Sequence, residues 1–253
     1  MKKIAIVTGA SSGMGAEFVT QISQRYSKLN EIWIIARRKE LLEELAEKIT
    51  MDTKIFALDL SKDEDIRKLS MKLEEEKPDV KLLVNSAGYG VVGPFELSDY
   101  ESQIGMIDVN CRALTAVTYL VLPYMGSNSR IIQMASSAAF IPQPDFAVYA
   151  ATKSYVLSFS RALKRELKER EITVTAVCPG PVKTAFFDIA DPNDQKPFYK
   201  KMVMANPRRV VEKAIRDCAL GDEVSVYGIS MKAARFLAKI LPTKVLVNFM
   251  HRH

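Results

Sequence analysis

The feature that most constrains the fold is a series of short, uninterrupted apolar runs, each followed by a segment with helical periodicity. The runs are residues 3–8, 31–36, 54–60, 81–88, 130–137, 172–180 and 223–227. Strands without polar alternation are buried on both faces, which is typical of a parallel sheet between two layers of helices. The sequence therefore predicts an α/β fold. We expect a single doubly wound domain over residues 1–253, with a parallel sheet of about seven strands.

Helical periodicity fills the stretches between these runs. The expected helices end near Lys28, cover 39–49, follow Ser61 as a helix N-cap, and cover about 99–125, 148–170 and 207–219. Residues 185–206 are expected to form a loop over the substrate. Residues 228–253 form an apolar, basic extension that Pro242 interrupts. As an amphipathic helix this extension has three open placements: over the substrate pocket, against another subunit, or in peripheral contact with a membrane.

A glycine-rich turn joins the first strand to the first helix. The stretch TGASSGMG, residues 8–15, places Gly9, Gly13 and Gly15 between an apolar run and a helical pattern. Glycines permit a tight turn and a close approach of the backbone, and a helix N-terminus attracts an anion. Because the second strand follows about 20 residues later, this pattern indicates dinucleotide binding.

The end of the second strand indicates which dinucleotide binds. A carboxylate there would bind the ribose 2′-hydroxyl of NAD, whereas an arginine accommodates the 2′-phosphate of NADP. The stretch IIARRKE supplies Arg37 and Arg38, with no acidic residue before Glu40. A guanidinium group matches phosphate geometry, so NADP(H) is favoured over NAD(H). The alternative is that both arginines only begin a solvated helix.

Few residues are available for acid–base chemistry. The only histidines, His251 and His253, stand at the end of the sequence, which argues against a Ser-His-Asp triad and against a His-ligated metal. Tyr149 and Lys153 are one helical turn apart, so the ammonium group is expected to lower the pKa of the phenol and let it exchange protons. The alternative is a core tyrosine and a surface lysine on an amphipathic helix.

Cysteine content and net charge bear on the protein's setting. The three cysteines are far apart and form no Cys-x-x-Cys pair, which argues against a disulfide scaffold or a zinc site. We therefore expect no metal and a reducing, cytoplasmic location. The formal net charge of +6 suits an anionic ligand such as a phosphorylated cofactor, and it does not indicate a nucleic-acid partner.

Taken in order along residues 3 to about 184, the motifs resemble those of the short-chain dehydrogenase/reductase (SDR) superfamily. They are Thr8-Gly9-x-x-x-Gly13-x-Gly15, Asp59 in ALDLS, NSAG at 85–88, Asn110 in DVN, the serines at 136–137, Tyr149-x-x-x-Lys153 and PGPVKT at 179–184. Ser86 departs from the family's second asparagine in N-N-A-G. The resemblance implies a Rossmann-type fold and an NADP-preferring oxidoreductase.

The resemblance also implies roles for individual residues. Tyr149 would donate or accept the proton at the substrate oxygen, Lys153 would bind the nicotinamide ribose, and Asn110 would hold a water in a proton relay. Ser136 would orient the substrate carbonyl. It is preferred to Ser137 because it precedes Tyr149 by thirteen positions, and because neighbours in a strand face opposite sides. The implied cofactor-binding residues are Gly9, Ser11, Ser12, Gly13, Met14, Gly15, Arg37, Arg38, Asp59, Leu60, Asn85, Ala87, Gly88, Asn110, Tyr149, Lys153, Pro179, Gly180, Val182 and Thr184.

The substrate is expected against the segments 89–97, 138–146 and 185–204. Their apolar side chains are Phe95, Phe140, Phe146, Phe186, Phe187 and Met202. Such a lining suits a bulky apolar ketone or alcohol, for example a hydroxysteroid or a 3-oxoacyl compound, although several of these residues could instead fasten loops to the core. The expected function is NADP(H)-dependent interconversion of a secondary alcohol and a ketone. The alternative is a non-catalytic NADP-binding sensor or scaffold. The resemblance further implies a homodimer or homotetramer.

Overall fold

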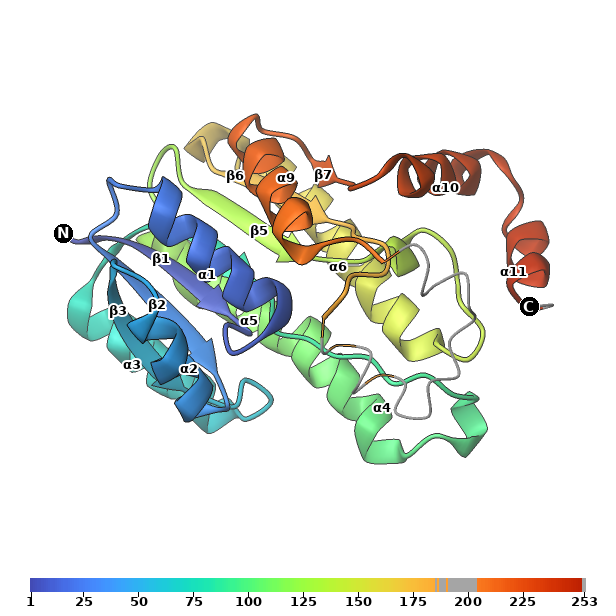
Figure 1. The fold of residues 1–253 in the computed structure, drawn as a ribbon, viewed down its shortest axis with the longest axis horizontal. Coiled ribbons are helices and arrows are strands. Elements are labelled where there is room, and N and C mark those ends of the chain that lie inside the picture. Colours follow the sequence, from blue (N-terminus) through green and yellow to red (C-terminus); the bar gives the residue numbers. More distant parts are fainter. Residues whose placement is uncertain (185, 187–189, 191–203, 252–253) are drawn as a thin grey trace.

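The computed structural model describes residues 1–184, 186, 190 and 204–251, and is built around a seven-stranded sheet (Figure 1). The strands are β1 (Lys3–Thr8), β2 (Glu31–Ala36), β3 (Asp52–Ala57), β4 (Asp79–Asn85), β5 (Arg130–Met134), β6 (Thr173–Val177) and β7 (Val224–Ser225). Their order is β3-β2-β1-β4-β5-β6-β7, and every neighbouring pair is parallel. The predicted doubly wound α/β fold is confirmed.

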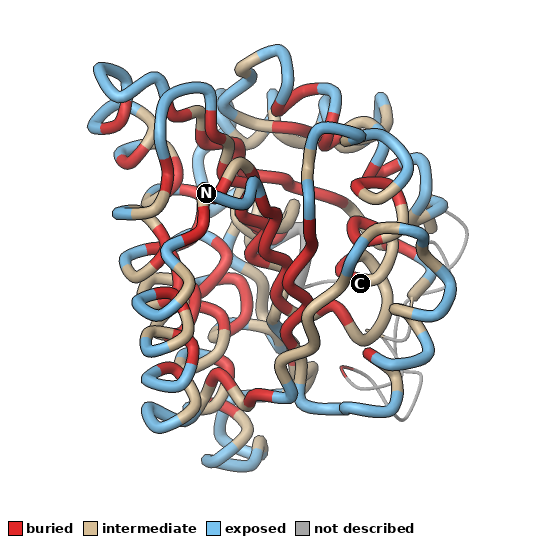
Figure 2. The backbone as a smooth tube through the Cα atoms, turned by 90° about the vertical axis from the view of Figure 1, so that its left-hand side faces the viewer, coloured by how far each residue is buried: buried red, intermediate tan, exposed pale blue. Residues whose placement is uncertain are grey.

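Helices flank this sheet on both faces, and the last two described helices extend beyond it (Figure 1). They are α1 (Gly13–Arg25), α2 (Lys39–Glu47), α3 (Asp63–Glu76), α4 (Tyr100–Ile107), α5 (Leu114–Val121), α6 (Ala147–Glu166), α9 (Pro207–Ala219), α10 (Ile229–Ile240) and α11 (Thr243–His251). Alternate strand residues feed two cores. Ile4 and Ile6 of β1 pack with α3, α5 and α6, whereas Ala5 and Val7 pack with α1, α2 and α9. Figure 2 shows the buried strands between helices whose outer sides are exposed.

The strand order reverses at β1, which lies between β2 and β4. In open parallel sheets the crevice at such a reversal, beyond the carboxyl ends of the strands, is where ligands bind. Here Thr8 ends β1 and Asn85 ends β4 in register with it. The Thr8 hydroxyl oxygen accepts hydrogen bonds from the backbone N–H groups of Ser86 and Ala87, both at 3.1 Å. The two loops that leave β1 and β4 are thereby held together.

Four apolar runs extend about three residues past the strands β3, β4, β5 and β6, which end at Ala57, Asn85, Met134 and Val177. Just beyond these points a few backbone N–H groups still bond to a neighbouring strand, as Cys178 does to Ser225 at 2.8 Å, and others bond to loops. Ser137 N–H, for example, donates to the carbonyl of Pro179 at 2.8 Å. The predicted strand ends at 60 and 137 were therefore wrong, whereas the turns expected at Gly88 and at Pro179-Gly180 do follow the strands.

The long helical region predicted at 99–125 is interrupted by a π-helical turn, Asp108–Ala113, between α4 and α5. By length and hydropathy the run Tyr100–Tyr124 could cross a membrane, but a core helix passes the same test. Met106, Val117 and Val121 are fully buried in the protein core. Packing thus explains the apolar character of this region.

Candidate active site

One cavity of about 610 Å³ opens at the carboxyl ends of β1, β2, β4, β5 and β6. Its wall contains most of the glycine-rich loop and most of the predicted cofactor-binding residues. Those in the wall are Gly9, Ser11, Ser12, Gly13, Met14, Gly15, Arg37, Arg38, Asp59, Leu60, Ala87, Gly88, Tyr149, Lys153, Pro179, Gly180, Val182 and Thr184. The fold thus gathers residues from Gly9 to Thr184 around one space.

The glycine-rich loop packs so closely that side chains are excluded from it. Gly9 has φ +67°, and a Cβ there would lie 2.7 Å from the backbone nitrogen of Ala87. A Cβ on Gly15 would lie 2.0 Å from the carbonyl oxygen of Gly9. Gly13 also has a positive φ, and faces Thr184 across the loop. A Cβ is excluded by contacts at Gly9 and Gly15, and the positive φ of Gly13 favours glycine there, as the sequence predicted.

Arg38 lies over the glycine-rich loop. Its guanidinium group donates hydrogen bonds to the hydroxyl oxygens of Ser11 and Ser12, at 3.1 and 3.0 Å. Ser12 is the N-cap residue of α1, but its side chain does not cap the helix. The first turn of α1 contains no acidic residue. A cation and a helix N-terminus therefore meet at one end of the cavity, where phosphate groups are favoured.

Asp59 organises the loop that follows β3. Its carboxylate accepts hydrogen bonds from the backbone N–H and the hydroxyl group of Ser61, at 3.0 and 2.7 Å. The prediction that Ser61 caps the next helix was wrong. The N-cap residue of α3 is Lys62, and the Ser61 hydroxyl is engaged by Asp59 within the loop. The helix begins with Asp63 and Asp65, whose charges favour a helix N-terminus without a capping side chain.

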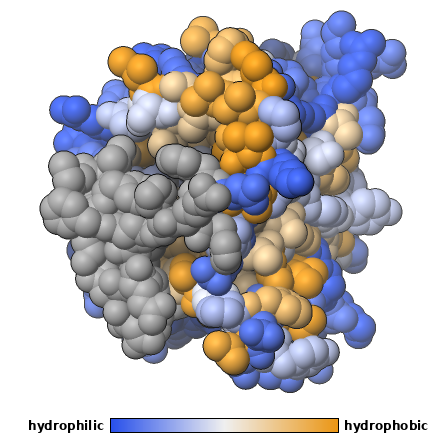
Figure 3. All heavy atoms as spheres, turned by 90° about the vertical axis from the view of Figure 1, so that its right-hand side faces the viewer, coloured by the Kyte–Doolittle hydropathy of each residue, from blue (hydrophilic) through white to orange (hydrophobic). Residues whose placement is uncertain are grey.

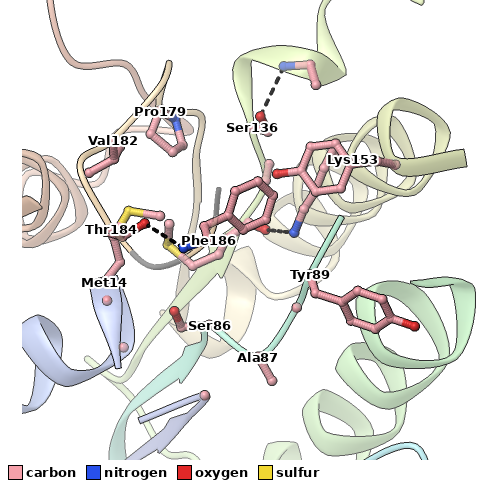
Figure 4. Close-up of a pocket in the computed structure, with 18 of the residues that line it drawn as sticks. Met14, Ser86, Ala87, Tyr89, Ser136, Lys153, Pro179, Val182, Thr184 and Phe186 are labelled. Carbon is pink, nitrogen blue, oxygen red and sulfur yellow. Dashed lines mark hydrogen bonds between the residues drawn. The ribbon is translucent and has the colours of Figure 1, made fainter. Parts of the chain in front are cut away.

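Tyr149 and Lys153 are both buried, one turn apart on α6. Lys153 Nζ donates a hydrogen bond to the carbonyl oxygen of Met134 at 2.8 Å, drawn as a dashed line in Figure 4. The same nitrogen lies 5.5 Å from the centroid of the Tyr149 ring. The alternative of a surface lysine on this helix is excluded by this burial. The two side chains share one wall of the cavity.

Burial dominates the protonation of this pair. It raises the pKa of Tyr149 to about 12, with an opposing contribution from a hydrogen bond with Ser136. It lowers the pKa of Lys153 to about 8. Lys153 was expected to lower the pKa of Tyr149, but the pKa is raised and Lys153 does not contribute to the shift. The lysine nitrogen lies over the ring and bonds to Met134, and desolvation opposes the charged form of both groups.

Ser136 and Ser137 both line the cavity, so the argument from strand alternation was wrong. β5 ends at Met134, and the serines lie in the turn and short 3₁₀ helix that follow. The Ser136 hydroxyl oxygen accepts a hydrogen bond from Ala138 N–H at 3.1 Å, and the hydroxyl also interacts with Tyr149. Of the two serines, Ser136 is the one with a side-chain contribution to the pKa of the tyrosine.

Asn110 and Asn85 are absent from the cavity wall among the described residues. Asn110 is fully buried in the π-helical turn, behind Gly88. Its side chain accepts from Tyr89 N–H at 3.1 Å and donates to the Tyr89 carbonyl at 2.9 Å and the Thr152 hydroxyl at 3.1 Å. The side chain of Asn85 instead donates to the Thr118 hydroxyl in the core. Both side chains therefore position neighbouring segments and do not reach the cavity.

The substrate end of the cavity is aromatic. Phe140, Phe146 and Phe186 line it, as predicted. The Phe146 ring stacks on Tyr149 with centroids 4.2 Å apart. Phe95 lies on the surface in a short 3₁₀ helix, so its predicted place in the lining was wrong. Phe187, Met202 and most of the expected loop 185–206 lie outside the described residues.

The sequence did not assign α10 to this site, although covering the pocket was one placement left open for it. Ser230, Met231 and Ala234 of α10 line the cavity. A Cβ on Gly180 would lie 2.6 Å from the sulfur of Met231. The available signal was spacing, because Met231, Ala234 and Ala238 follow one another at intervals of three and four residues and so share one helix face.

The residues present fit a nicotinamide dinucleotide. The cavity extends from the glycine-rich loop, which excludes side chains, to Tyr149 and Lys153. A Cβ on Gly88 would lie 2.7 Å from the Asn110 side-chain oxygen, so the backbone after β4 is also kept clear. Arg38, Ser11, Ser12 and the start of α1 would hold the phosphates at the other end.

Comparisons with known proteins agree with this geometry. The model of the short chain dehydrogenase family matches residues 3–195. An uncharacterized oxidoreductase of Staphylococcus epidermidis is 30% identical over 197 residues, covering 77% of this chain and 84% of that protein. A very-long-chain 3-oxoacyl-CoA reductase of Anas platyrhynchos is 30% identical over 257 residues, covering 97% and 78%.

Solved structures show the same likeness. A serine dehydrogenase complexed with NADP+ is 28% identical, with a TM-score of 0.78 and 88% and 94% of the two chains covered. A 3-ketoacyl-(acyl-carrier-protein) reductase from Brucella melitensis, complexed with NADH, is 26% identical, with a TM-score of 0.75 and coverage of 88% and 95%. Together with the family match and the fold, these likenesses identify the chain as a member of the short-chain dehydrogenase/reductase family, an NAD(P)-binding oxidoreductase that acts on CH–OH and ketone groups.

Proposed function

We propose that this protein reduces a bulky apolar ketone, of the 3-oxoacyl thioester type, with NADPH, and that Tyr149 donates the proton. The observation that carries the proposal is a buried phenol at the cavity wall, in contact with Ser136 and with its pKa raised to about 12. Such a phenol stays protonated near neutral pH. It can therefore give a proton to an oxygen that gains negative charge, which is the requirement of ketone reduction.

A bound nicotinamide cofactor supplies the hydride, and the chain's own residues handle the proton. Ser136 donates a hydrogen bond to the substrate carbonyl and holds it beside the Tyr149 hydroxyl. Lys153 is fixed by its bond to Met134 with its nitrogen 5.5 Å from the centroid of the Tyr149 ring, and its ammonium group would stand beside the phenolate that proton transfer leaves. Asn110 acts as a positioning residue, because it joins Tyr89 to Thr152 on the catalytic helix.

The preference for NADPH rests on two arginines. Arg38 already contacts the loop serines, and Arg37 lines the same end of the cavity. A 2′-phosphate would give both guanidinium groups a charged partner that NADH lacks. Solved neighbours differ in their bound cofactor, since one holds NADP+ and another NADH. The proposed preference for NADPH therefore rests on the two arginines of this chain.

Two observations support the substrate class. The cavity is mostly apolar at the end formed by Phe140, Phe146 and Met231, which suits a hydrocarbon chain better than a small polar ketone. A relative that is named as a very-long-chain 3-oxoacyl-CoA reductase aligns with 97% of this chain. A hydroxysteroid ketone is the second candidate, because an aromatic lining also suits fused rings.

The test is oxidation of NADPH, followed by its absorbance, with 3-oxoacyl thioesters of increasing chain length and a panel of steroid ketones. We expect turnover to rise with chain length, and Tyr149→Phe to lower kcat by about 10²–10⁴-fold while NADPH still binds. The matched control is Tyr155→Phe. Tyr155 is on the same helix, is exposed, and bonds to Thr115 on the outer surface.

Two results would contradict the proposal. Turnover that survives Tyr149→Phe would remove Tyr149 as the proton donor. NADPH binding without turnover on any ketone would favour the sensor or scaffold function that the sequence left open.

A further inference from the structure

α10 presents an apolar stripe to the solvent. Ile229, Ala233, Phe236 and Ile240 follow one another at intervals of four, three and four residues, which places them on one face of the helix. Ile229 is 87% exposed, Phe236 63% and Ile240 62%, and no residue of α10 is buried. Figure 3 shows apolar side chains gathered on the side of the molecule that carries α10 and α11. Soluble proteins rarely leave such a patch without a binding role.

Cations border this stripe, and the described residues of α10 and α11 include no acidic side chain. At about 100° per residue, Lys232 and Lys239 lie along one edge of the stripe, with Arg235 beyond them. Lys244 is exposed at the start of α11. After Glu223 the sequence contains five Lys or Arg residues and no Asp or Glu. Since the whole chain has a formal net charge of +6, most of that excess lies in this terminal segment.

The opposite side of α10 is part of the active-site cavity. Met231 and Ala234 face the cavity, and Met231 fills the space that a side chain on Gly180 would need. One helix therefore separates the substrate end of the cavity from an apolar, positively charged outer surface. Pro242 then turns the chain into α11, where Val245 is also exposed.

We propose that α10 and α11 bind reversibly to an anionic phospholipid surface. α10 lies in the plane of the interface with Phe236 and Ile240 among the upper acyl chains, while Lys232 and Lys239 reach the phosphate groups. The charge pattern supports this occupant, because a basic edge beside an apolar stripe complements anionic headgroups above a hydrocarbon layer. An apolar substrate would then reach the Met231 side of the cavity from the lipid, and this last step rests on the proposed function.

The same charges disfavour a second copy of the chain as the occupant. A twofold interface pairs a surface with itself, so the lysines of one copy would face those of the other, and no carboxylate among the described residues of α10 and α11 would offset them. Exposed apolar side chains on α4 and α5, including Ile104 and Tyr119, have both signs of charge near them, as in the ion pair of Arg112 with Asp108. That surface suits an interface between copies better than α10 does.

The test measures co-sedimentation of the full chain with vesicles of phosphatidylcholine alone and with vesicles that contain phosphatidylglycerol. We expect binding only to the anionic vesicles, with loss of binding as salt is raised. The double variant Phe236→Gln/Ile240→Gln and the double variant Lys232→Glu/Lys239→Glu should each weaken binding at least ~10-fold.

Matched controls exist elsewhere on the surface. Phe95→Gln replaces a phenylalanine that is 67% exposed, away from α10, and Lys28→Glu/Lys168→Glu reverses two exposed lysines on other elements. Both controls should bind vesicles as the wild type does, and all variants should keep the wild-type rate on a short, water-soluble ketone. A circular dichroism spectrum and a melting curve for each variant show whether it remains folded, so that loss of vesicle binding can be distinguished from unfolding.

Three results would overturn the inference. They are no binding to anionic vesicles, equal binding by the α10 variants and the wild type, or a change of oligomeric state in the α10 variants without a change in vesicle binding. The last would identify a second copy as the occupant. Sedimentation needs no turnover, so a protein that binds vesicles but reduces no ketone would refute the proposed function and leave this inference standing.

Discussion

The two ends of the cavity are built differently. At the dinucleotide end the wall is mostly backbone, and glycines are required because their neighbours leave no room for a Cβ, as at Gly9 and Gly15. At the substrate end the wall is made of large side chains from separate segments, such as Phe146 and Met231. Backbone walls fix one shape, whereas side-chain walls can change with each substitution. We therefore expect changes at the first end to affect binding in an all-or-none manner, and changes at the second to adjust specificity.

The largest effect is expected from Gly9→Val. A Cβ would approach Ala87 within 2.7 Å at φ +67°, which costs about 1–2 kcal/mol in backbone strain and also separates the β1 and β4 loops. NADPH affinity, measured by fluorescence titration, should fall by at least ~100-fold. The control is Gly126→Val, since a Cβ at Gly126 meets nothing within 4 Å. Equal affinity in both variants would show that the backbone wall is not rigid.

A smaller effect, limited to one cofactor, is expected from Arg38→Ala. Loss of a guanidinium group that binds a charged phosphate should weaken NADPH binding about 10–100-fold and leave NADH binding nearly unchanged. Arg37→Ala should also weaken NADPH binding, but by a smaller factor, because Arg38 is the arginine already held over Ser11 and Ser12. Equal losses for NADPH and NADH would refute a 2′-phosphate site at these residues.

The pH dependence tests the buried pair between the two ends. Burial lowers the pKa of Lys153 to about 8 and raises that of Tyr149 to about 12. The ammonium group is thus present below about pH 8 and is lost as pH rises through that value. We expect kcat/KM for NADPH in ketone reduction to be flat below pH 8 and to fall about tenfold per unit above it. If kcat/KM began to fall only near the ordinary lysine pKa, the assignment of a lowered pKa to Lys153 would be contradicted.

The smallest effect is expected from Met231→Ala at the substrate end. The variant should leave the dissociation constant of NADPH unchanged and alter KM for long-chain ketones by a few-fold, about 1 kcal/mol or less. Ala233→Gly, on the outer face of the same helix, controls for loss of helix stability. A large change in NADPH affinity would show that the two ends are not independent.

The sequence predicted the dinucleotide end in detail because its requirements are local. A strand, a glycine turn and a helix follow one another within residues 3–15, and each position has one physical task. The substrate end depends on α10, more than 200 residues away from that turn, and nothing local to Met231 indicates that it faces Gly180. Helical spacing groups Met231 with Ala234 on one face, but it does not identify the distant segment against which that face packs.

One error within the site has a local cause. Strand alternation was used to choose between Ser136 and Ser137, which assumed that the strand continued through both serines. The water relay at Asn110 was implied by the family resemblance and stays a prediction. The strand had already ended at Met134, and Asn110 lies in a π-helical turn that directs its side chain to Tyr89 and Thr152.

That π-helical turn makes the spacing of the chain here as important as its composition. A π turn accommodates one residue more than an α-helix of the same rise, so removing Cys111 would let α4 and α5 join as one regular helix. Side chains on α4 and α5 would keep their faces, because the deleted residue is the one that the π turn absorbs. The damage would fall on the turn itself, which holds the Asn110 side chain against Tyr89 and Thr152. A single-residue deletion would thus remove this support of the catalytic helix while leaving the buried face of α4 in place.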